Sequence, residues 1–481
     1  MMAMAVRSIV SDRRRGERFS NFWSVYFFPV VLPLLLGLGL GPLVAALIAS
    51  ENWIFAASLV FLVPLAILLI RYPFAAIIVW MVVMPWFPFR DAYKYVYFAV
   101  HRLLIPLGLG ITILSHMLDV EKCRPLRPKL ADLAVIAFGA MGVVSIFVAG
   151  SHWKTVFTLQ DRFLVPFSAY WLIRISNAQR QALRRLLPFM LLVCLAESVV
   201  GLVGWFAPQA LPSIWHMRLT GDRVSGTFGA SGTYGCVLMF FLVFLYHEAM
   251  HREPGLVRMA LLLVFSLGAV CVFFTFTRSI WLAGIFVLLG LLCLYPKATA
   301  LLLVVILPIM LIMSVDLLAR EFAYASKRLS TEDTANARVV LAAAGRQMFL
   351  ARPVFGWGYN TYDRHDWKFM KRAGNVAVTE WHVREGTSHN TLLTILAEMG
   401  VVGFFLLYFP VFWWLVRTVR ALPRVRREGF WSRRILIVLW LPLIAQIIVS
   451  QATDLRFATY ALTLFWIGLG FVANIVESYL Y

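Results

Sequence analysis

Residues 390–416 read NTLLTILAEMGVVGFFLLYFPVFWWLV, an apolar run interrupted by a single charged side chain, Glu398. A helix of about 20 apolar residues crosses a hydrocarbon core of about 30 Å, so this stretch is long enough to span a membrane. It follows directly on Ser388 and His389, at the end of a polar segment at 316–388. The sequence therefore places one histidine where a polar segment meets a membrane-spanning helix.

The rest of the chain has the same apolar character. Of its 481 residues 61% are hydrophobic and 14% are charged, which is typical of a polytopic membrane protein and excludes an ordinary globular domain. Two of the fourteen candidate spans, 73–88 and 161–176, are short enough to be re-entrant or interfacial. We therefore predict an all-α polytopic membrane protein with 12–14 transmembrane helices and one large external loop. The candidate spans are 25–48, 52–70, 73–88, 101–118, 130–149, 161–176, 186–206, 230–248, 257–275, 278–295, 298–315, 390–416, 433–452 and 456–478.

The basic residues predict an orientation. With the N-terminus inside, cytoplasmic segments and span ends hold 24 of the 44 Lys and Arg, short external loops hold nine, and 316–388 holds eleven. Lys and Arg accumulate in cytoplasmic loops, so this count favours an extracytoplasmic 316–388. We expect about eleven transmembrane helices in 1–315, an external loop with a surface helix in 316–388, and about three helices in 389–481. No cleavable signal peptide is expected, because Arg7 to Arg18 precede a full-length span.

The formal net charge of +20 does not indicate a nucleic-acid partner. About half of the positive charge is the orientation signal. Membrane lipids and an anionic lipid or lipid-linked pyrophosphate are therefore the favoured partners. The five cysteines lie on the predicted cytoplasmic side or within predicted spans. Their spacing fits neither a disulfide framework nor a zinc site.

The external segment contains one predicted helix, at 335–350, with Val340, Ala343, Ala344 and Met348 along one stripe. Arg352-Pro353 ends it, and the glycine-rich run 356–360 predicts a tight turn. Such a helix is expected to lie along the membrane–water boundary, with Trp367 and Trp381 as interfacial anchors.

Six ionisable residues fall at external span ends: Arg223, Arg278, Arg338, His389, Asp454 and Arg456. Arg278 stands between two apolar runs, where an arginine is costly without a partner, although it could also snorkel to the headgroups. Arg223 lies in a glycine-rich stretch and Arg338 begins the surface helix; ordinary solvated arginines are the alternative for both. Several guanidiniums on one face would suit a pyrophosphate. Because the external loops contain no Asp-x-Asp pair, we expect arginine rather than a metal ion to neutralise the charge.

His389 is the candidate general base, because an imidazole with a near-neutral pKa can accept a hydroxyl proton. The alternative is a capping or interfacial histidine. On an ideal helix Gly400 lies about 20° and Gly403 about 40° from His389, which predicts a glycine strip that admits a close helix or a lipid chain. Glu398 falls on the opposite face, and Glu197, in mid-span, is interpreted as a buried packing acid.

These motifs together resemble the O-antigen ligase and polymerase superfamily. The signature is His389-Asn390, nine residues, and then Gly400-Val-Val-Gly403. Supporting segments are Arg223-Val-Ser-Gly-Thr-Phe-Gly229, Thr277-Arg278-Ser279, and Asn336-Ala-Arg338 leading to Arg352-Pro-Val-Phe-Gly-Trp-Gly358. The likeness covers roughly 200–475. The chain departs from the family after Gly229, where Ala230-Ser231-Gly232 replaces the commoner Asn-Pro-Asn.

The resemblance implies a GT-C-like glycosyltransferase of the bacterial inner membrane, without a cofactor, that works on the periplasmic face. Its donor would be a glycan on undecaprenyl pyrophosphate. His389 would activate an acceptor hydroxyl for attack at the anomeric carbon with inversion, and Arg278, Arg338 and Arg223 would hold the pyrophosphate.

Lipid A-core and a second lipid-linked glycan are the two main candidate acceptors, and a protein acceptor is a further variant that stays open. A ligase would use lipid A-core, and a polymerase would use a second lipid-linked glycan; one large external loop favours the ligase. A transporter without chemistry is the alternative from another class. It would be expected to place ionisable groups near the bilayer midplane, where only Glu197 is clearly deep.

Overall fold

The structure is a computed structural model that describes residues 68–87, 94–117, 128–149, 153–176, 180–212, 223–305, 333–370 and 388–480, together with Ala49, Leu65 and Pro308. For residues 94–95, 153–155 and 333–338 it describes the helical backbone only. Within these ranges all regular structure is helical and no strand occurs. The predicted all-α class is confirmed for this part of the chain.

Eight helices in the described ranges are long and apolar enough to cross a membrane. In lipid a backbone must satisfy its hydrogen bonds within its own segment, and a continuous helix does so. The predicted spans 25–48 and nearly all of 52–70 lie outside the described residues, so the expected total of 12–14 stays a prediction. The eight helices are Phe98–Met117 (the π-helical η4 Phe98–Leu103 and α6 Leu104–Met117), α7 Leu130–Val148, α10 Arg180–Phe206, α12 Ser231–Met250, α13 Leu256–Phe273, Thr391–Arg424 (mainly α18 Thr391–Ala421), α19 Arg433–Ser450 and α20 Thr459–Leu480.

Three predicted spans appear as shorter helices. They are α4 Ala75–Val83, which continues to Trp86 through the 3-10 turn η2 Met84–Trp86, α9 Val165–Ile175, and α14 Arg278–Leu294. Just before α9 the chain runs through α8 Trp153–Leu159 and a second π-helical segment, η5 Gln160–Leu164. Short 3-10 turns lie in the described connections between the spans, among them η6 Pro208–Ala210, η9 Leu422–Arg424 and η10 Leu455–Phe457.

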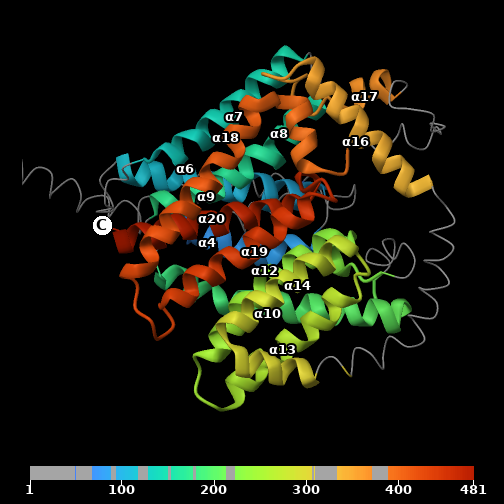
Figure 1. The fold of residues 1–481 in the computed structure, drawn as a ribbon. Helices are drawn as coiled ribbons and strands as arrows, with labels where there is room; N and C mark the ends of the chain where they lie inside the picture. Colours follow the sequence, from blue (N-terminus) through green and yellow to red (C-terminus); the bar gives the residue numbers. More distant parts are fainter. Residues whose placement is uncertain are drawn as a thin grey trace, which may run out of the picture.

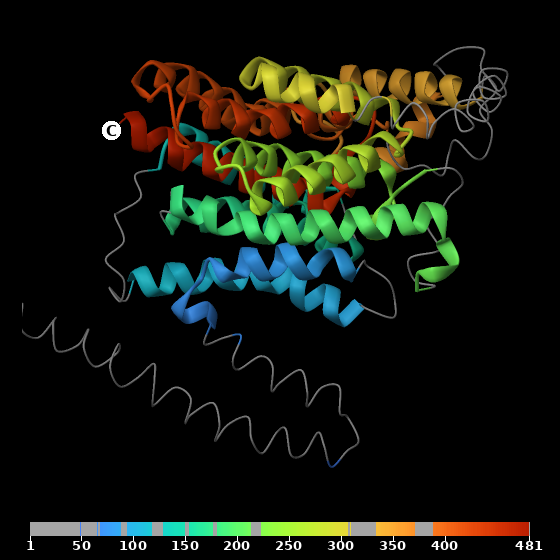
Figure 2. The same cartoon turned by 90° about the horizontal axis from the view of Figure 1, so that it is seen from below.

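The bundle is built around α12 and α20. In the most apolar 18-residue window of each helix, 89% of the α12 residues and 83% of the α20 residues are buried. α12 packs against α10, α13, α14 and α19, while α20 packs against α9, α18 and α19. Figures 1 and 2 show the long helices stacked in layers, with α4 and α6 on one side and α16 (Asp333–Ala351) on the other. A helix enclosed in this way is apolar all round, which explains why α12 shows no polar face.

A buried ion-pair network ties α7, α9 and α20 together at one end of the bundle. Arg174 donates to both carboxylate oxygens of Asp132 at 2.9 and 3.0 Å and to Glu477 at 2.8 Å, and its side chain is fully buried. Asn474 accepts a further bond from Arg174 at 2.7 Å. The arginine and Asp132 are therefore neutralised inside the bundle, as a buried charge requires.

The helix predicted at 335–350 is confirmed as α16 Asp333–Ala351. Val340, Ala344 and Met348 of its predicted stripe are buried, and Ala343 is half-buried. This face packs on α17 (Tyr362–Met370) and α18. Trp367 of α17 is 47% exposed, and Trp381 lies outside the described residues.

Candidate active site

His389 stands immediately before α18 with a left-handed backbone, φ 54°. Residues other than glycine adopt this conformation uncommonly. Neighbouring bonds stabilise it: Ser388 Oγ donates to the Asn390 carbonyl at 2.9 Å and accepts the Asn390 N–H at 3.2 Å. Asn390 caps α18, since its Oδ1 accepts the Leu393 N–H at 3.0 Å. The His389 side chain is partly exposed, so a strained and anchored segment presents an accessible imidazole at the helix start.

The turn between α19 and α20 anchors this segment from the other side. Asn390 Nδ2 donates to the Gln451 carbonyl at 3.0 Å. Thr391 Oγ1 donates to the Thr453 carbonyl at 3.2 Å and accepts the Leu455 N–H at 3.0 Å. Residues 451–455 therefore determine where α18 begins and where His389 lies.

Asp454 and Arg456, which the sequence places among the external ionisable residues, bind each other inside the protein. Arg456 is 5% exposed and donates from Nε and Nη2 to the Asp454 carboxylate, at 2.9 and 2.7 Å. Its Nη1 donates to Glu398 Oε2 at 2.5 Å. Glu398 also accepts the backbone N–H groups of Asn360 and Tyr362, at 2.8 and 3.1 Å. This buried network joins α18, the loop before α17 and η10.

The predicted continuous glycine strip is wrong at Gly400. Gly400 has φ 64° and ψ −167°, which interrupts the helical conformation inside α18. The loop at 353–358 docks there: Val401 N–H donates to the Pro353 carbonyl at 2.8 Å, and Gly358 N–H donates to the Glu398 carbonyl at 2.8 Å. A Cβ on Gly400 would overlap the backbone of Val354. Only glycine combines that conformation with this close approach.

The angular relation of an ideal helix therefore does not extend from His389 past Gly400. Gly403 is buried against Met399 of the same helix. The surface beside Gly400 is filled by protein backbone and not by a lipid chain or a second helix. The predicted strip requires 3.6 residues per turn throughout, and the backbone break at Gly400 interrupts that periodicity.

Residues 223–229, the segment that begins with Arg223, form a hydrogen-bonded turn beside the start of α14. Val224 N–H donates to the Phe274 carbonyl at 3.0 Å. Residues Gly226–Phe228 form the 3-10 turn η7 with left-handed Gly226 (φ 52°), followed by left-handed Gly229 (φ 68°). Arg223 itself is partly exposed. The two glycines provide the positive φ values that the turn needs.

The residues that follow this turn have one hydrogen bond to the α14 start and lie near the His389 anchor. Ser231 Oγ, at the start of α12, lies 2.9 Å from Thr277 Oγ1. The adjacent Gly232 faces Thr453, whose carbonyl accepts the bond from Thr391. The segments of Arg223, Arg278 and His389 therefore meet at one end of the bundle.

Arg278 is the first residue of α14 and is exposed. Helix N-termini leave backbone N–H groups without intrahelical partners, so an anion there can bind both these groups and the guanidinium. Arg338 lies within α16, but its side chain is outside what the structure describes. Its predicted role stays a prediction.

Sequence reasoning missed a polar cluster on the two π-helical segments. Arg102 of η4 donates to both oxygens of Asp161 of η5, at 2.6 and 2.8 Å, and His101 Nδ1 accepts from Trp80 at 3.1 Å. Arg162 of η5 donates to Asn360 Oδ1 at 2.9 Å, which connects the cluster to the loop held by Glu398. A π-helical turn has no sequence signature, but ionisable residues inside predicted spans were a usable signal.

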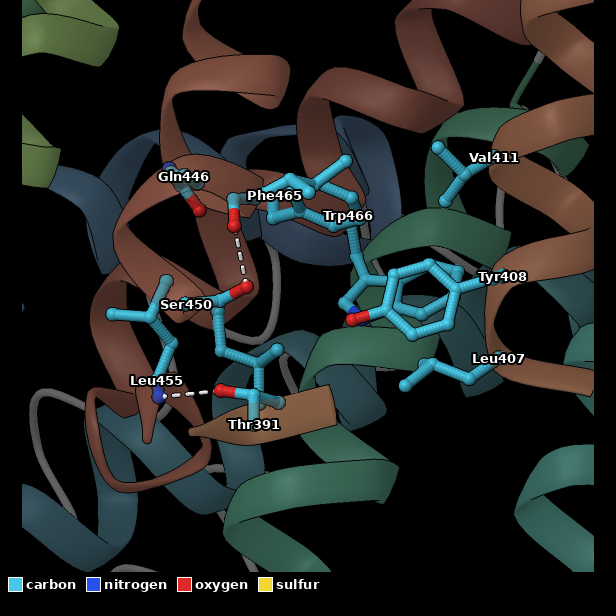
Figure 3. A pocket seen from close by; sticks show the side chains of 11 residues that line it. Thr391, Leu407, Tyr408, Val411, Gln446, Ser450, Leu455, Phe465 and Trp466 are labelled. Carbon is cyan, nitrogen blue, oxygen red and sulfur yellow. Dashed lines mark hydrogen bonds between the residues drawn. The ribbon is translucent and has the colours of Figure 1, made fainter. Parts of the chain in front are cut away.

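An apolar pocket that Thr391 helps to line lies between α18, α19 and α20 (Figure 3). Leu407, Tyr408 and Val411 line it from α18, and Trp466 from α20. Its cavity volume is about 60 Å³. Gln446 contributes a buried Nε2 for which no acceptor is found among the described residues. The pocket thus provides an apolar surface on α18, the helix that begins directly after His389.

Among the described residues, no group of three or more His, Cys, Asp or Glu side chains is arranged to hold a metal ion. Residues 261–408 match the family model described as O-antigen ligase. The match includes Arg278, Arg338, His389, Gly400 and Gly403, whereas Arg223 and Arg456 lie outside it. The comparison with curated proteins gave no match. The chain is thus a multi-pass membrane protein, with eight candidate spans among its described residues, in which residues 261–408 are similar to the O-antigen ligase family.

Proposed function

We propose that this enzyme is an O-antigen ligase-type glycosyltransferase of the bacterial inner membrane, which moves a glycan from undecaprenyl pyrophosphate to a hydroxyl group of lipid A-core. The observation that carries the proposal is the meeting of three segments at one end of the bundle. His389 lies directly before α18. Ser231 Oγ is within hydrogen-bond distance of Thr277 Oγ1 beside Arg278, and Gly232 lies near Thr453, whose carbonyl accepts the bond from Thr391.

His389 is proposed as the general base. The acceptor oxygen attacks the anomeric carbon while the imidazole takes its proton, and the bond from that carbon to the pyrophosphate oxygen breaks. The new glycosidic bond forms on the face opposite the leaving group, so the configuration inverts. Undecaprenyl pyrophosphate leaves, and His389 then releases the proton to solvent. A positioned general base contributes about 10²- to 10⁴-fold in rate.

Arginines are proposed to hold the leaving group. Arg278 is exposed at the N-terminus of α14. Its guanidinium group and the first backbone N–H groups of the helix can bind phosphate oxygens together. Arg223 is brought to the same place by the Val224–Phe274 hydrogen bond, and Arg338 of α16 completes the set. Arg456 has no part in it, because Asp454 and Glu398 already neutralise it. Guanidinium charge serves here in place of a metal ion.

The lipid chain of the donor is proposed to run along the apolar pocket that Thr391 helps to line. Tyr408, Val411, Phe465 and Trp466 offer it apolar and aromatic contact. Burial of apolar surface stabilises by about 25 cal/mol per Å², so this contact contributes affinity without taking part in the chemistry. This surface replaces the predicted glycine strip.

The reacting end is proposed to face the periplasm, with 316–388 as its large loop and a GT-C-like arrangement of spans. The distribution of Lys and Arg supports this orientation. The Arg174–Asp132–Glu477 network then lies toward the cytoplasmic end.

Deletion of the gene, followed by analysis of the lipid-linked pool, tests the proposal. Long glycan chains that accumulate on undecaprenyl pyrophosphate would identify a ligase, and single repeat units would identify a polymerase. Complementation with His389→Ala should fail, whereas complementation with His116→Ala, which changes an exposed histidine of α6, should succeed. Full activity of His389→Ala would overturn the proposed mechanism.

A further inference from the structure

Glu197 is a fully buried carboxyl group in α10, one of the helices long enough to span the membrane. A buried acid in such a helix is costly and usually has a function. Among the described residues it forms no ion pair. Its hydrogen bonds go instead to the turn that follows Arg223: Oε2 accepts the Thr227 N–H at 3.1 Å, and Oε1 bonds with Thr227 Oγ1 at 2.5 Å.

The turn is shaped around this carboxyl group. A Cβ on Gly226 would overlap Glu197 Oε2 and the ring of Tyr234, so the glycine lets the backbone approach the acid closely. Tyr234 OH in turn donates to the backbone carbonyl of Glu197 at 2.9 Å. Glu197 and Tyr234 therefore enclose the η7 turn from α10 and α12.

The same turn carries Arg223 at its beginning. Three residues separate Arg223 from Thr227, and between them Val224 N–H is bound to the Phe274 carbonyl, four residues before Arg278. With both of these points fixed, the backbone leading from Arg223 has little freedom to move away from the α14 start. An apolar side chain would fill this place in the span at lower cost, so the carboxyl group is best explained by the bonds that it makes to the turn.

We propose that Glu197 is a positioning residue that holds Arg223 beside Arg278, so that the two guanidiniums bind the pyrophosphate of the lipid-linked donor together. The inference rests on the proposed function and assigns to Glu197 a role in substrate binding that acts through the Arg223 loop. Glu197 does not touch the substrate and does not exchange a proton with it.

A double-mutant cycle tests this role. Glu197→Ala and Arg223→Ala should each lower kcat/KM for the lipid-linked donor about 10- to 100-fold, the size of effect expected when a binding group is misplaced by about 1 Å. Because Glu197 acts through Arg223, the double variant should lose little more than Arg223→Ala alone, whereas independent sites would give the product of the two losses. Ser198→Ala, a buried neighbour on α10, is the matched control and should keep wild-type activity.

Two further variants separate positioning from acid–base chemistry and from misfolding. Glu197→Gln keeps an acceptor for Thr227 and should retain most of the activity with an unchanged pH profile. Thr227→Val removes the hydroxyl bond while leaving the carboxyl group in place. Its kcat/KM should fall less than that of Glu197→Ala, and adding Thr227→Val to Arg223→Ala should cause little further loss. If Glu197→Ala does not fold, Thr227→Val replaces it in the double-mutant cycle.

Three outcomes would overturn the inference. They are losses that multiply in the double variant, full activity of Glu197→Ala, and a Glu197→Gln variant as inactive as Glu197→Ala. An Arg223→Ala enzyme with wild-type activity would do so too. In each case an inactive His389→Ala enzyme would leave the proposed transferase function standing, so the two failures can be told apart.

Discussion

The Arg456 guanidinium lies 2.5 Å from the Glu398 carboxylate, at the point where α18, the loop before α17 and η10 meet. The contact joins residues 58 positions apart in sequence. Glu398 also accepts two backbone N–H groups of the loop, so this single carboxyl group supports the loop as well as the arginine. The His389 segment is held by the same η10 region through Thr391.

Glu398→Ala should destabilise the enzyme strongly. The substitution leaves Arg456 with one carboxylate partner and leaves the N–H groups of Asn360 and Tyr362 without their acceptor. Removing one partner of a buried ion pair costs about 3–5 kcal/mol. A thermal unfolding curve in detergent should show a clearly lower Tm, whereas Glu428→Ala, at an exposed position, should not change it. Equal Tm values for the two variants would contradict the assigned role.

Gly400→Ala should be more destabilising than Gly429→Ala. Both glycines have positive φ values, 64° and 91°. A Cβ at Gly400 also overlaps the Val354 backbone, while at Gly429 nothing lies within 4 Å. Backbone strain alone costs on the order of 1–3 kcal/mol, and the overlap at Gly400 adds to it. The measurement is the yield and Tm of each purified variant; similar values would show that the 353–358 loop does not need this close approach.

Arg278→Ala should lower kcat/KM about 100-fold, which is the loss typical when a charge-stabilising donor is removed from an active site. Arg278→Lys should restore only part of it, because an ammonium group retains the charge but cannot bind two phosphate oxygens as the planar guanidinium does. Transfer assays with purified donor give both values. The control is Arg185→Ala, which changes an exposed arginine near the start of α10. Full recovery by lysine would indicate that charge alone is needed.

Chelation should leave transfer unchanged. If arginines carry the charge of the leaving group, the rate in excess EDTA equals the rate with added Mg²⁺. The assay uses the purified enzyme and its lipid-linked donor, with a magnesium-dependent transferase as the positive control for chelation. Activity that is lost in EDTA and returns with Mg²⁺ would exclude the arginine-only proposal.

The stability of α17 should fall as the pH rises from about 4 to about 6. Burial of Asp366 raises its pKa from 3.8 to about 6, so the folded protein favours the protonated carboxyl. The group stabilises the fold below its ordinary pKa, and this contribution is lost as the pH passes through the raised value. Hydrogen exchange of the α17 amides across this pH range measures the effect.

Asp366→Asn should remove that pH dependence, because the amide does not titrate. Asp363→Asn, at an exposed position in the same helix, should keep most of it, because burial of Asp366 is a larger cause of the raised pKa than the Asp363 charge. The hypothesis fails if the Asp366→Asn protein shows the same slope as the wild type.

The membrane-spanning helices were largely predictable. In α12 and α13 the predicted spans 230–248 and 257–275 differ from the observed helices by at most two residues at each end. Apolar length decides such segments, since a backbone in lipid has to bond within its own helix. α16 was predictable for a similar local reason, from its apolar stripe and the Arg352-Pro353 stop.

The candidate site was only partly predictable. The external residue set included both Arg278 and Arg456, yet Arg278 is exposed at a helix start, while Arg456 is buried between two carboxylates. Asp454, two residues before Arg456, is a local signal for one of its partners, whereas Glu398, 58 positions away, is not. Glu197 was interpreted as a packing acid, and only its bonds to Thr227 reveal a link to the Arg223 turn.

The sequence by itself determined the class of the protein, the candidate spans and the residues able to act as base and anion ligands, because hydrophobic length, side-chain chemistry and motif spacing are local properties. Tertiary structure alone decided which of these residues meet. Val401 binds Pro353, Arg456 binds Glu398, and Ser231 contacts Thr277 across 46 to 58 positions. Such contacts depend on how the helices pack and where a backbone breaks, as at Gly400, and no periodic pattern encodes them.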